Sequence, residues 1–352
     1  MERCTRCGFP DTRPGIIFKG DVCQACLNYE KRKYVDWNER WNDFRKLSEM
    51  YRNGNRYDCI IPVSGGKDSY FLVHTATEMG LKPLCVTVTD PFTHTKAGIH
   101  NLSNLLNTFG INHWQYRINE DLFRRATRAA FEDKGEPLKF IEYAIYTIPV
   151  MLARALNIGL VIFGENSGYE YGSREEDTFD ADPDIVSIIE KCRSEKSWWA
   201  TRGVTGEEIE SILPPGEWDK EVQAVYMSYF RPWSSVTHLE IARKYGFKDL
   251  DDTGEWFRKG TIEQFEQIDS KGYLFHLWMK YPKFGFQRVS DIASRRVREG
   301  AMTLRQAQAQ IFDKDPVCDP IAKKDFADFC GYDEGEMWEV INKWWSPNVP
   351  RD

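Results

Sequence analysis

A short segment between an apolar run and a helical pattern has the residue types of a phosphate-binding loop. Residues 59–63 predict a strand buried on both faces, and a helix follows that ends near Gly80. Between them stands Ser64-Gly65-Gly66-Lys67-Asp68-Ser69. In such a turn, backbone N–H groups and the positive helix end point at an anion, and the glycines admit phosphate oxygens. Lys67 would supply charge, and Asp68 could hold Mg²⁺. The spacing is not that of a Walker A loop.

Four cysteines have the paired spacing of a metal site. Cys4, Cys7, Cys23 and Cys26 form C-x2-C-x15-C-x2-C. Two-residue spacing lets both thiolates of a pair turn toward one ion, and two pairs complete a closed tetrahedral shell. Because a closed shell leaves no position for water, we expect a structural Zn²⁺ ion. An iron–sulfur cluster and a redox dithiol stay open as alternatives.

Polar residues follow two further predicted strands. The β-rich run 82–89 ends at Thr89-Asp90, and the apolar run 160–163 ends at Gly164-Glu165-Asn166. In an open parallel sheet, ligands gather at the carboxyl ends of the strands that flank the reversal of strand order. We therefore expect Thr89 and Asp90 on one side of the phosphate loop and Gly164, Glu165 and Asn166 on the other.

The elements that must position these residues form a doubly wound parallel α/β sheet. A further strand is expected over 113–117, and a helix over 98–109 ends at Gly110. More helices are expected over 240–245, 292–299, 304–312, 322–329 and 334–345. We expect a four-Cys module over 1–35, an ATP-binding α/β domain over 36–215 and a mainly helical substrate or partner region over 216–352. The turn-rich segment 194–219 is interpreted as an insertion or a lid over the site.

The hexapeptide at 64–69 resembles the SGGxDS signature of the PP-loop ATP pyrophosphatase superfamily. Members of that superfamily adenylate a carbonyl-type oxygen and release pyrophosphate, after which a nitrogen or sulfur nucleophile displaces AMP. The resemblance implies a PP-loop, HUP-like fold and an ATP site. The ATP-binding residues would be the loop together with Thr89, Asp90, Gly164 and Asn166.

A narrower resemblance covers the whole chain in order. The cysteine pairs and the loop are joined by Tyr169-Glu170-Tyr171-Gly172 and by Tyr281-Pro282-Lys283-Phe284-Gly285-Phe286 with Arg288 and Asp291. Together they resemble the N-acetyl sugar amidotransferase family of surface-polysaccharide, lipopolysaccharide O-antigen and nonulosonic-acid biosynthesis. The resemblance implies that an acetamido group of a sugar becomes an acetamidino group at the expense of ATP and ammonia. It also implies that ammonia comes from a separate glutaminase and a barrel subunit resembling imidazole glycerol phosphate synthase.

The cysteines of the chain do not have the sequence context of a glutaminase nucleophile, which agrees with a separate source of ammonia. None of the nine stands in a G-x-C-x-G elbow, and position 2 is Glu2 rather than a cysteine nucleophile.

Roles within the reaction can be assigned by chemistry. Lys67 and Asp68 would act on the phosphates, and Glu165 or Glu170 could be the base that deprotonates the attacking ammonium. Aromatic side chains at Tyr169, Tyr171 and Phe284 could stack on a sugar, and Lys283 or Arg288 would suit a carboxylate or a diphosphate. Structural interpretations stay open: a packed Tyr-Glu-Tyr loop, solvated flanks for Lys283 and Arg288, and a helix-start role for Asp291.

Composition excludes some classes of protein. A net charge of −7, from 47 basic and 54 acidic residues, argues against wholesale nucleic-acid coating. The longest apolar tract, 143–163, is interrupted by Pro149 and Arg154, and no apolar leader is visible, so we expect a cytoplasmic protein with no membrane partner.

Two rival functions remain. One is a PP-loop tRNA thiolase, which the 12 basic against 8 acidic residues of segment 1–56 keep open. The other is a non-enzymatic zinc adaptor.

Overall fold

A parallel sheet forms the centre of the computed structural model, which describes residues 1–52, 54–216 and 222–351. Its five strands lie in the order β5-β4-β3-β6-β7. The strands are β3 (Cys59–Pro62), β4 (Pro83–Thr89), β5 (His113–Arg117), β6 (Leu160–Phe163) and β7 (Gln223–Tyr226). Strand β3 pairs with β4 on one side and β6 on the other, so the strand order reverses beside the first strand. The predicted doubly wound parallel sheet is confirmed.

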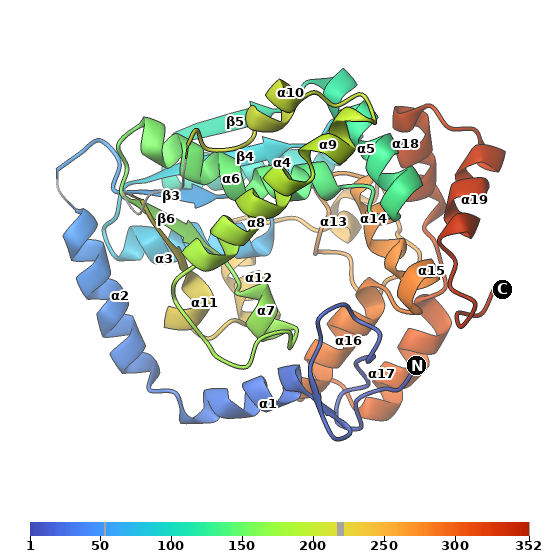
Figure 1. Ribbon diagram of the computed structural model, residues 1–352. Helices are drawn as coiled ribbons and strands as arrows, with labels where there is room; N and C mark the ends of the chain where they lie inside the picture. Colours follow the sequence, from blue (N-terminus) through green and yellow to red (C-terminus); the bar gives the residue numbers. More distant parts are fainter. Residues whose placement is uncertain (53, 217–221, 352) are drawn as a thin grey trace.

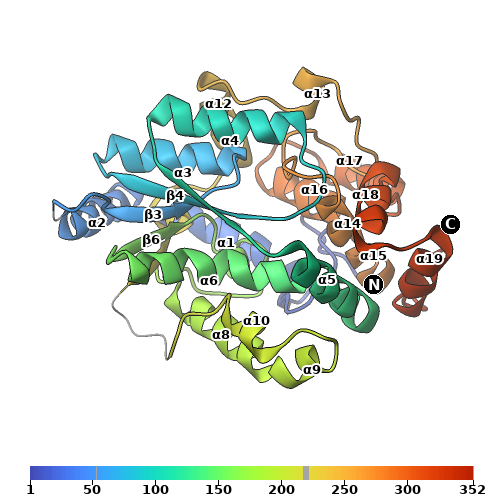
Figure 2. The same cartoon turned by 90° about the horizontal axis from the view of Figure 1, so that it is seen from above.

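Helices cover both faces of the sheet, as Figures 1 and 2 show. One face carries α2 (Trp37–Tyr51), α3 (Lys67–Glu78), α4 (Lys96–Phe109), α11 (Met227–Phe230) and α12 (Ser235–Lys244). The other carries α5 (Glu120–Lys134), α6 (Lys139–Ala155) and α8 (Asp182–Ser194). Alternate residues of β3 serve the two cores, because Ile60 packs with α5 and α6 while Cys59 and Ile61 pack with α3. A strand covered on both faces has no polar positions, as its apolar sequence indicated.

The N-terminal and C-terminal segments lie side by side at one end of the sheet (Figure 1). The N-terminal elements are β1 (Phe18–Lys19), β2 (Val22–Cys23), α1 (Gln24–Lys31) and the 3-10 helix η1 (Arg32–Tyr34). The C-terminal helices are α13 (Leu250–Thr253), α14 (Tyr273–Trp278), α15 (Lys280–Phe284), α16 (Arg288–Arg298), α17 (Leu304–Lys314), α18 (Pro320–Cys330) and α19 (Glu334–Lys343). The predicted C-terminal helical region is confirmed. Among the described residues, no helix is both long and apolar enough to cross a membrane.

Local signals predicted helix ends well. Gly110 ends α4 in the left-handed conformation, with φ 63°. Thr303 begins α17 through a capping box with Gln306. The short strand β7 was not predicted, and it places part of the sheet beyond residue 215.

The expectation of a lid over the site at 194–219 is wrong for its described residues, 194–216. This segment forms α9 (Lys196–Ala200) and α10 (Gly206–Glu210), which pack on the outer side of α5 and α6. Trp199 is fully buried against the edge of Phe140, with 5.7 Å between ring centroids. Arg125 of α5 holds Glu208 at 2.7 Å. A large buried aromatic anchors the segment to the core, away from the cavity described below. Residues 217–219 of the expected lid lie outside the described part.

Candidate active site

The loop after β3 closes tightly against α4. Ser64 N–H donates to Ser69 Oγ at 3.0 Å, and Gly66 N–H donates to Ser64 Oγ at 3.3 Å. Gly65 has φ 88°, and a Cβ there would lie 2.7 Å from the backbone nitrogen of Leu102. Glycine is therefore required at position 65, both for its conformation and for the close approach. Helix α3 begins immediately afterwards at Lys67, so its N-terminus faces the loop.

The buried Lys67 and the partly exposed Asp68 form a charge cluster with residues distant in the sequence. The Lys67 ammonium lies 2.8 Å from Asp68 Oδ2 and 3.2 Å from Glu266 Oε1. Burial lowers the pKa of Lys67, but Asp68 and Glu266 outweigh it, so the ammonium stays protonated. Burial raises the pKa of Asp68, and Lys67 with a 2.6 Å hydrogen bond from His238 Nδ1 overcomes this and holds that pKa well below its usual range. The cluster presents one cation and an ionised carboxylate beside the loop.

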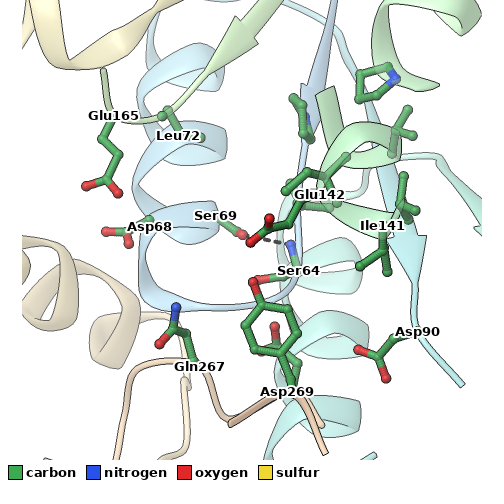
Figure 3. Close-up of a pocket in the computed structure, with 18 of the residues that line it drawn as sticks. Ser64, Asp68, Ser69, Leu72, Asp90, Ile141, Glu142, Glu165, Gln267 and Asp269 are labelled. Atoms are coloured by element: carbon green, nitrogen blue, oxygen red, sulfur yellow. Dashed lines mark hydrogen bonds between the residues drawn. The ribbon is translucent and has the colours of Figure 1, made fainter. Parts of the chain in front are cut away.

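A cavity of about 410 Å³ opens at the carboxyl ends of β3, β4 and β6 (Figure 3). Its apolar wall comes from Val63, Leu72, Val86, Val88 and Ile141. Its polar groups come from Ser64, Asp68, Ser69, Asp90, Glu142, Glu165, Gln267, Asp269 and Ser270. An apolar slot beside a phosphate loop suits a flat base together with a charged tail. We call this space the loop cavity.

A second cavity of about 370 Å³ adjoins it and is lined by cations. The two share Ser64, Asp68, Ser69, Glu142, Glu165, Gln267 and Asp269. The cations are Arg13, Lys67, Lys280, Arg288 and Arg295. We call this space the arginine cavity.

Glu266 organises the cations of the arginine cavity. Its carboxylate accepts from Arg295 at 2.5 Å, from Arg288 and from Ser235 at 2.6 Å. Burial raises the pKa of Glu266, but Arg295, Lys67 and Arg288 together hold it well below the usual range. One ionised carboxylate therefore orients three cations. The lining also holds the carboxylates of Asp68, Glu142, Glu165, Asp269 and Asp291, so cations and carboxylates stand side by side in this cavity.

Glu165 lies directly after β6 and lines both cavities. Figure 3 shows its carboxylate turned into the cavity on the side of Asp68. Burial and the nearby charge of Asp68 raise the pKa of Glu165. A carboxylate with a raised pKa that lines two cavities is suited to accept and release a proton.

The residues that follow β4 and β6 have mixed placements. Asp90 lines the loop cavity beside Asp269, whose pKa burial and the charge of Asp90 raise to about 7. Thr89 lines an adjoining space and accepts from Gln115 at 2.7 Å. Gly164 lines the loop cavity. Asn166 lies outside it, because its side chain caps α7 (Ser167–Glu170) by accepting from Tyr169 N–H.

The later sequence blocks supplied seven candidate site residues, and the structure brings three of them to the arginine cavity. Tyr171, Arg288 and Asp291 line it, with Arg288 donating to the Tyr171 hydroxyl at 3.2 Å. Burial raises the pKa of Asp291, but Lys280 at 2.9 Å and Arg13 at 2.5 Å outweigh it and lower that pKa.

The other four lie elsewhere. Glu170 pairs with Arg32 of η1, and the Tyr169 hydroxyl donates to the Asn28 carbonyl. Lys283 donates to the Lys134 carbonyl at the end of α5 at 2.8 Å. The Phe284 carbonyl accepts from Thr12 at 2.6 Å. These contacts hold segments together rather than face a ligand.

Several residues of the two cavities were not predicted from the sequence: Arg13, Glu142, Glu266, Asp269, Lys280 and Arg295. His238, the buried partner of Asp68, was not predicted either. Most stand alone in their segments and carry no spacing signal. Helix α16 is different, because Arg288, Asp291, Arg295 and Arg298 recur at intervals of three and four. That periodicity places them on one helix face and was the one signal that could have found Arg295.

The four cysteines meet at one point, as predicted. Their sulfur atoms all lie within 4.8 Å of one another, with Cys4 and Cys26 3.8 Å apart and Cys7 and Cys23 3.6 Å apart. Four thiolates at ~2.3 Å around a tetrahedral zinc ion would be about 3.8 Å apart, so the donor set fits. All four side chains are buried, and Arg298 of α16 donates to Cys7 Sγ at 3.6 Å. The cluster is a metal-binding site joined to the helix that carries Arg288 and Arg295.

Comparison with known proteins gives one family match. Residues 259–350 match the family described as "LPS biosynthesis protein WbpG-like, C-terminal domain". This match agrees with the resemblance to a surface-polysaccharide family, and its segment includes Glu266, Arg288 and Arg295. No curated protein matches the chain.

Three solved structures of synthetases are similar to this chain. An NH3-dependent NAD synthetase from Campylobacter jejuni, in complex with nitrate, is 13% identical with a TM-score of 0.31, over 51% of this chain and 92% of that one. An NMN synthetase from Francisella tularensis is 16% identical with a TM-score of 0.30, over 60% and 93%. An NAD+ synthetase from Burkholderia pseudomallei is 13% identical with a TM-score of 0.29, over 66% and 96%.

Proposed function

We propose that this protein is an ATP-dependent amidotransferase that adenylates the acetamido oxygen of an N-acetylated sugar and replaces it with nitrogen from ammonia. The products are an acetamidino sugar, AMP and pyrophosphate, made in the cytoplasm for lipopolysaccharide O-antigen or nonulosonic-acid biosynthesis. The observation that carries the proposal is the junction of the two cavities. There the loop 64–69, the carboxylate of Glu165 and the cations around Glu266 face one space. The WbpG-like match of residues 259–350 supports the pathway.

The chemistry explains why such a junction is needed. An amide is a poor electrophile, because its nitrogen lone pair is delocalised and its oxygen leaves badly. Attack of the amide oxygen on the α-phosphorus of ATP expels pyrophosphate and gives an O-adenylated imidate. Ammonia then adds to the imidate carbon, and AMP departs with the original oxygen as the amidine forms.

The loop 64–69 and the residues beside it would serve the two chemical steps. The N–H groups of residues 64–69 and the Lys67 ammonium would neutralise charge on the departing pyrophosphate. Mg²⁺ would be held against the phosphates by Asp68, which stays ionised beside Lys67, and would supply charge neutralisation there. Glu165 would accept a proton from the incoming ammonium, because it is the predicted base that lines the cavity, whereas Glu170 is paired with Arg32.

The arginine cavity would hold the sugar. Its cations suit a carboxylate or a diphosphate on the substrate, and the Tyr171 ring offers a surface for a sugar. The ammonia would come from a separate glutaminase and barrel subunit. In the described chain, no cysteine lines either cavity, so a cysteine nucleophile for glutamine has no place beside Glu165. The same observation disfavours the alternative, a PP-loop tRNA thiolase carrying sulfur on a cysteine.

Product mass tests this function directly. We expect the protein, supplied with a nucleotide-linked acetamido sugar, ATP, Mg²⁺ and an ammonium salt, to form AMP together with a sugar about 1 Da lighter, since C=O becomes C=NH. Mass spectrometry of the sugar and chromatography of the nucleotides measure both products. Release of ADP in place of AMP would contradict the proposal. Thiolated tRNA formed from a sulfur donor, with no change in any sugar, would establish the alternative.

We also propose that the four-Cys site holds a structural zinc ion. Metal analysis should find about one zinc per chain, because four thiolates fill the tetrahedral shell. Cys23→Ser should lower both the zinc content and the melting temperature, while Cys318→Ser, distant from the cluster, should change neither. A metal-free protein, or a Cys23→Ser variant that melts like the parent, would refute a structural zinc ion. Bound iron with sulfide would favour the cluster alternative.

A further inference from the structure

A third cavity, of about 360 Å³, lies behind the arginine cavity. It is bordered by α6, the α7 segment, α8 and β7, through Tyr146, Ser167, Gly168, Ser173, Arg174, Asp184, Ser187, Ile188 and Tyr226. Arg13 and Tyr171 line this space and the arginine cavity alike. These two side chains therefore form the partition between the two cavities. We call the third space the rear cavity.

The partition is made of side chains supplied by two different segments. The Arg13 guanidinium lies 4.3 Å from the centroid of the Tyr171 ring and 2.5 Å from Asp291. Arg13 belongs to the four-Cys module, whereas Tyr171 follows α7. The module is fixed to that segment, since Ile17 N–H donates to the Gly172 carbonyl at 2.9 Å. A Cβ at Gly172 would lie 2.5 Å from Ala25 N, so the contact leaves no free space. The partition itself consists of side chains, which Asp291 and Arg288 hold in place through Arg13 and the Tyr171 hydroxyl.

Glu165 lies close to the rear cavity. Tyr146, which lines it, stacks on Phe163, two residues before Glu165, with 5.6 Å between ring centroids. Burial and the charge of Glu165 raise the pKa of Tyr146 to about 12 and also raise the pKa of Tyr171. A small molecule crossing the partition would thus meet the carboxylate assigned as the base.

The walls of the rear cavity carry hydrogen-bonding groups that suit a small neutral molecule such as ammonia, since the charge of Asp184 is already paired with Arg174. Asp184 supplies a carboxylate, which accepts from the Tyr226 hydroxyl at 2.7 Å and from Arg174 at 3.2 Å. Hydroxyl groups of Tyr146, Ser167 and Ser187 add further polar sites. Ser187 of α8 is an exposed residue of the lining, as are Pro14, Ser167 and Ser173, and the loop 64–69 is not part of this lining.

The order of the proposed reaction requires a separate route for the nucleophile. When ATP fills the loop cavity and the sugar fills the arginine cavity, neither leaves a path for ammonia. A route from the rear cavity enters the arginine cavity at Arg13 and Tyr171 and does not pass the loop 64–69. We propose that the rear cavity is the ammonia inlet and that Arg13 and Tyr171 close it against water. This inference rests on the proposed function and adds the path and the partition to it.

A bulky side chain placed in the lining of the rear cavity tests whether ammonia enters through it. Ser187→Trp, at an exposed position of α8, should raise the KM for ammonium by about tenfold, with the KM for ATP and for the sugar unchanged. The matched control is Glu190→Trp, exposed on the same helix and outside the rear cavity, which should leave all three constants unchanged. An unchanged KM for ammonium in Ser187→Trp would overturn the inlet. Parent protein that forms no AMP from sugar and ATP would instead overturn the proposed function, and the inlet with it.

Removing the Tyr171 side chain tests whether the partition excludes water. Tyr171→Ala should admit water to the adenylated intermediate, whose hydrolysis returns the starting amide and AMP. The ratio of AMP released to amidine formed should rise above one in Tyr171→Ala and stay near one in Ser187→Trp. Equal amounts of AMP and amidine in Tyr171→Ala would overturn the role of the partition, even if the total rate falls.

Discussion

Replacing Lys67 with alanine should abolish AMP formation and leave the fold intact. The Lys67 ammonium is the buried cation at the start of α3, where it lines the arginine cavity, and the lining of the adjoining loop cavity contains no lysine or arginine among the described residues. Loss of one preorganised group that neutralises developing charge costs roughly 10²–10³ in rate, and the lysine also binds the phosphates, so at least ~10³-fold is expected. AMP and pyrophosphate, measured together after addition of sugar and ATP, check the effect.

The fold of this variant should survive because both partners of Lys67 keep other contacts. Glu266 retains Arg288 and Arg295, and Asp68 retains His238. Circular dichroism and the melting temperature should therefore stay close to those of the parent. Lys46→Ala, at an exposed lysine of α2, is the matched control and should keep full activity. Parent-like AMP and pyrophosphate release by Lys67→Ala would remove the loop from the mechanism.

Replacing Glu165 with glutamine should lower the rate of amidine formation by about 10²–10⁴-fold at neutral pH. The carboxylate must be ionised to accept a proton from ammonium, and burial beside Asp68 raises the pKa of Glu165. In the parent, the rate at fixed total ammonium should fall as the pH drops through this raised pKa and level off above it. Glutamine has no such titration and leaves only the reaction of free ammonia.

The pH profile separates a base from a merely structural carboxylate. In Glu165→Gln, the rate at fixed total ammonium should rise about tenfold per pH unit, because the fraction of free ammonia does so below its own pKa. Adenylation, followed as exchange of pyrophosphate into ATP, should continue in this variant. Glu170→Gln, which removes a carboxylate paired with Arg32 outside the cavities, should keep the parent profile. Parallel pH profiles for the parent and Glu165→Gln would exclude Glu165 as the base.

The sequence by itself determined the parts of the site that depend on neighbours along the chain. Gly65 and Gly66 between a buried strand and a helix predicted the phosphate loop, and the close approach of Leu102 shows why glycine stands at 65. Two C-x2-C pairs predicted the metal cluster, whose sulfur atoms do converge. Apolar runs predicted β3, β4 and β6, and their order around β3 brings Asp90 and Glu165 to the same cavity. These features are local because turn conformation, pair spacing and strand burial depend on a few adjacent residues.

The tertiary structure alone decided which charges surround that loop. His238 meets Asp68 across 170 residues, and Arg13 meets Asp291 across 278. Glu266 stands in a segment with no motif, yet it orients two arginines and Lys67. Conversely, Glu170 and Lys283 have the right chemistry but face other partners. A buried charged side chain is held in position by the oppositely charged side chains that are buried beside it. Their interaction is strong because water is excluded from them. Which charged residues are buried together depends on how distant segments of the chain pack. The spacing of residues along the sequence does not contain that information.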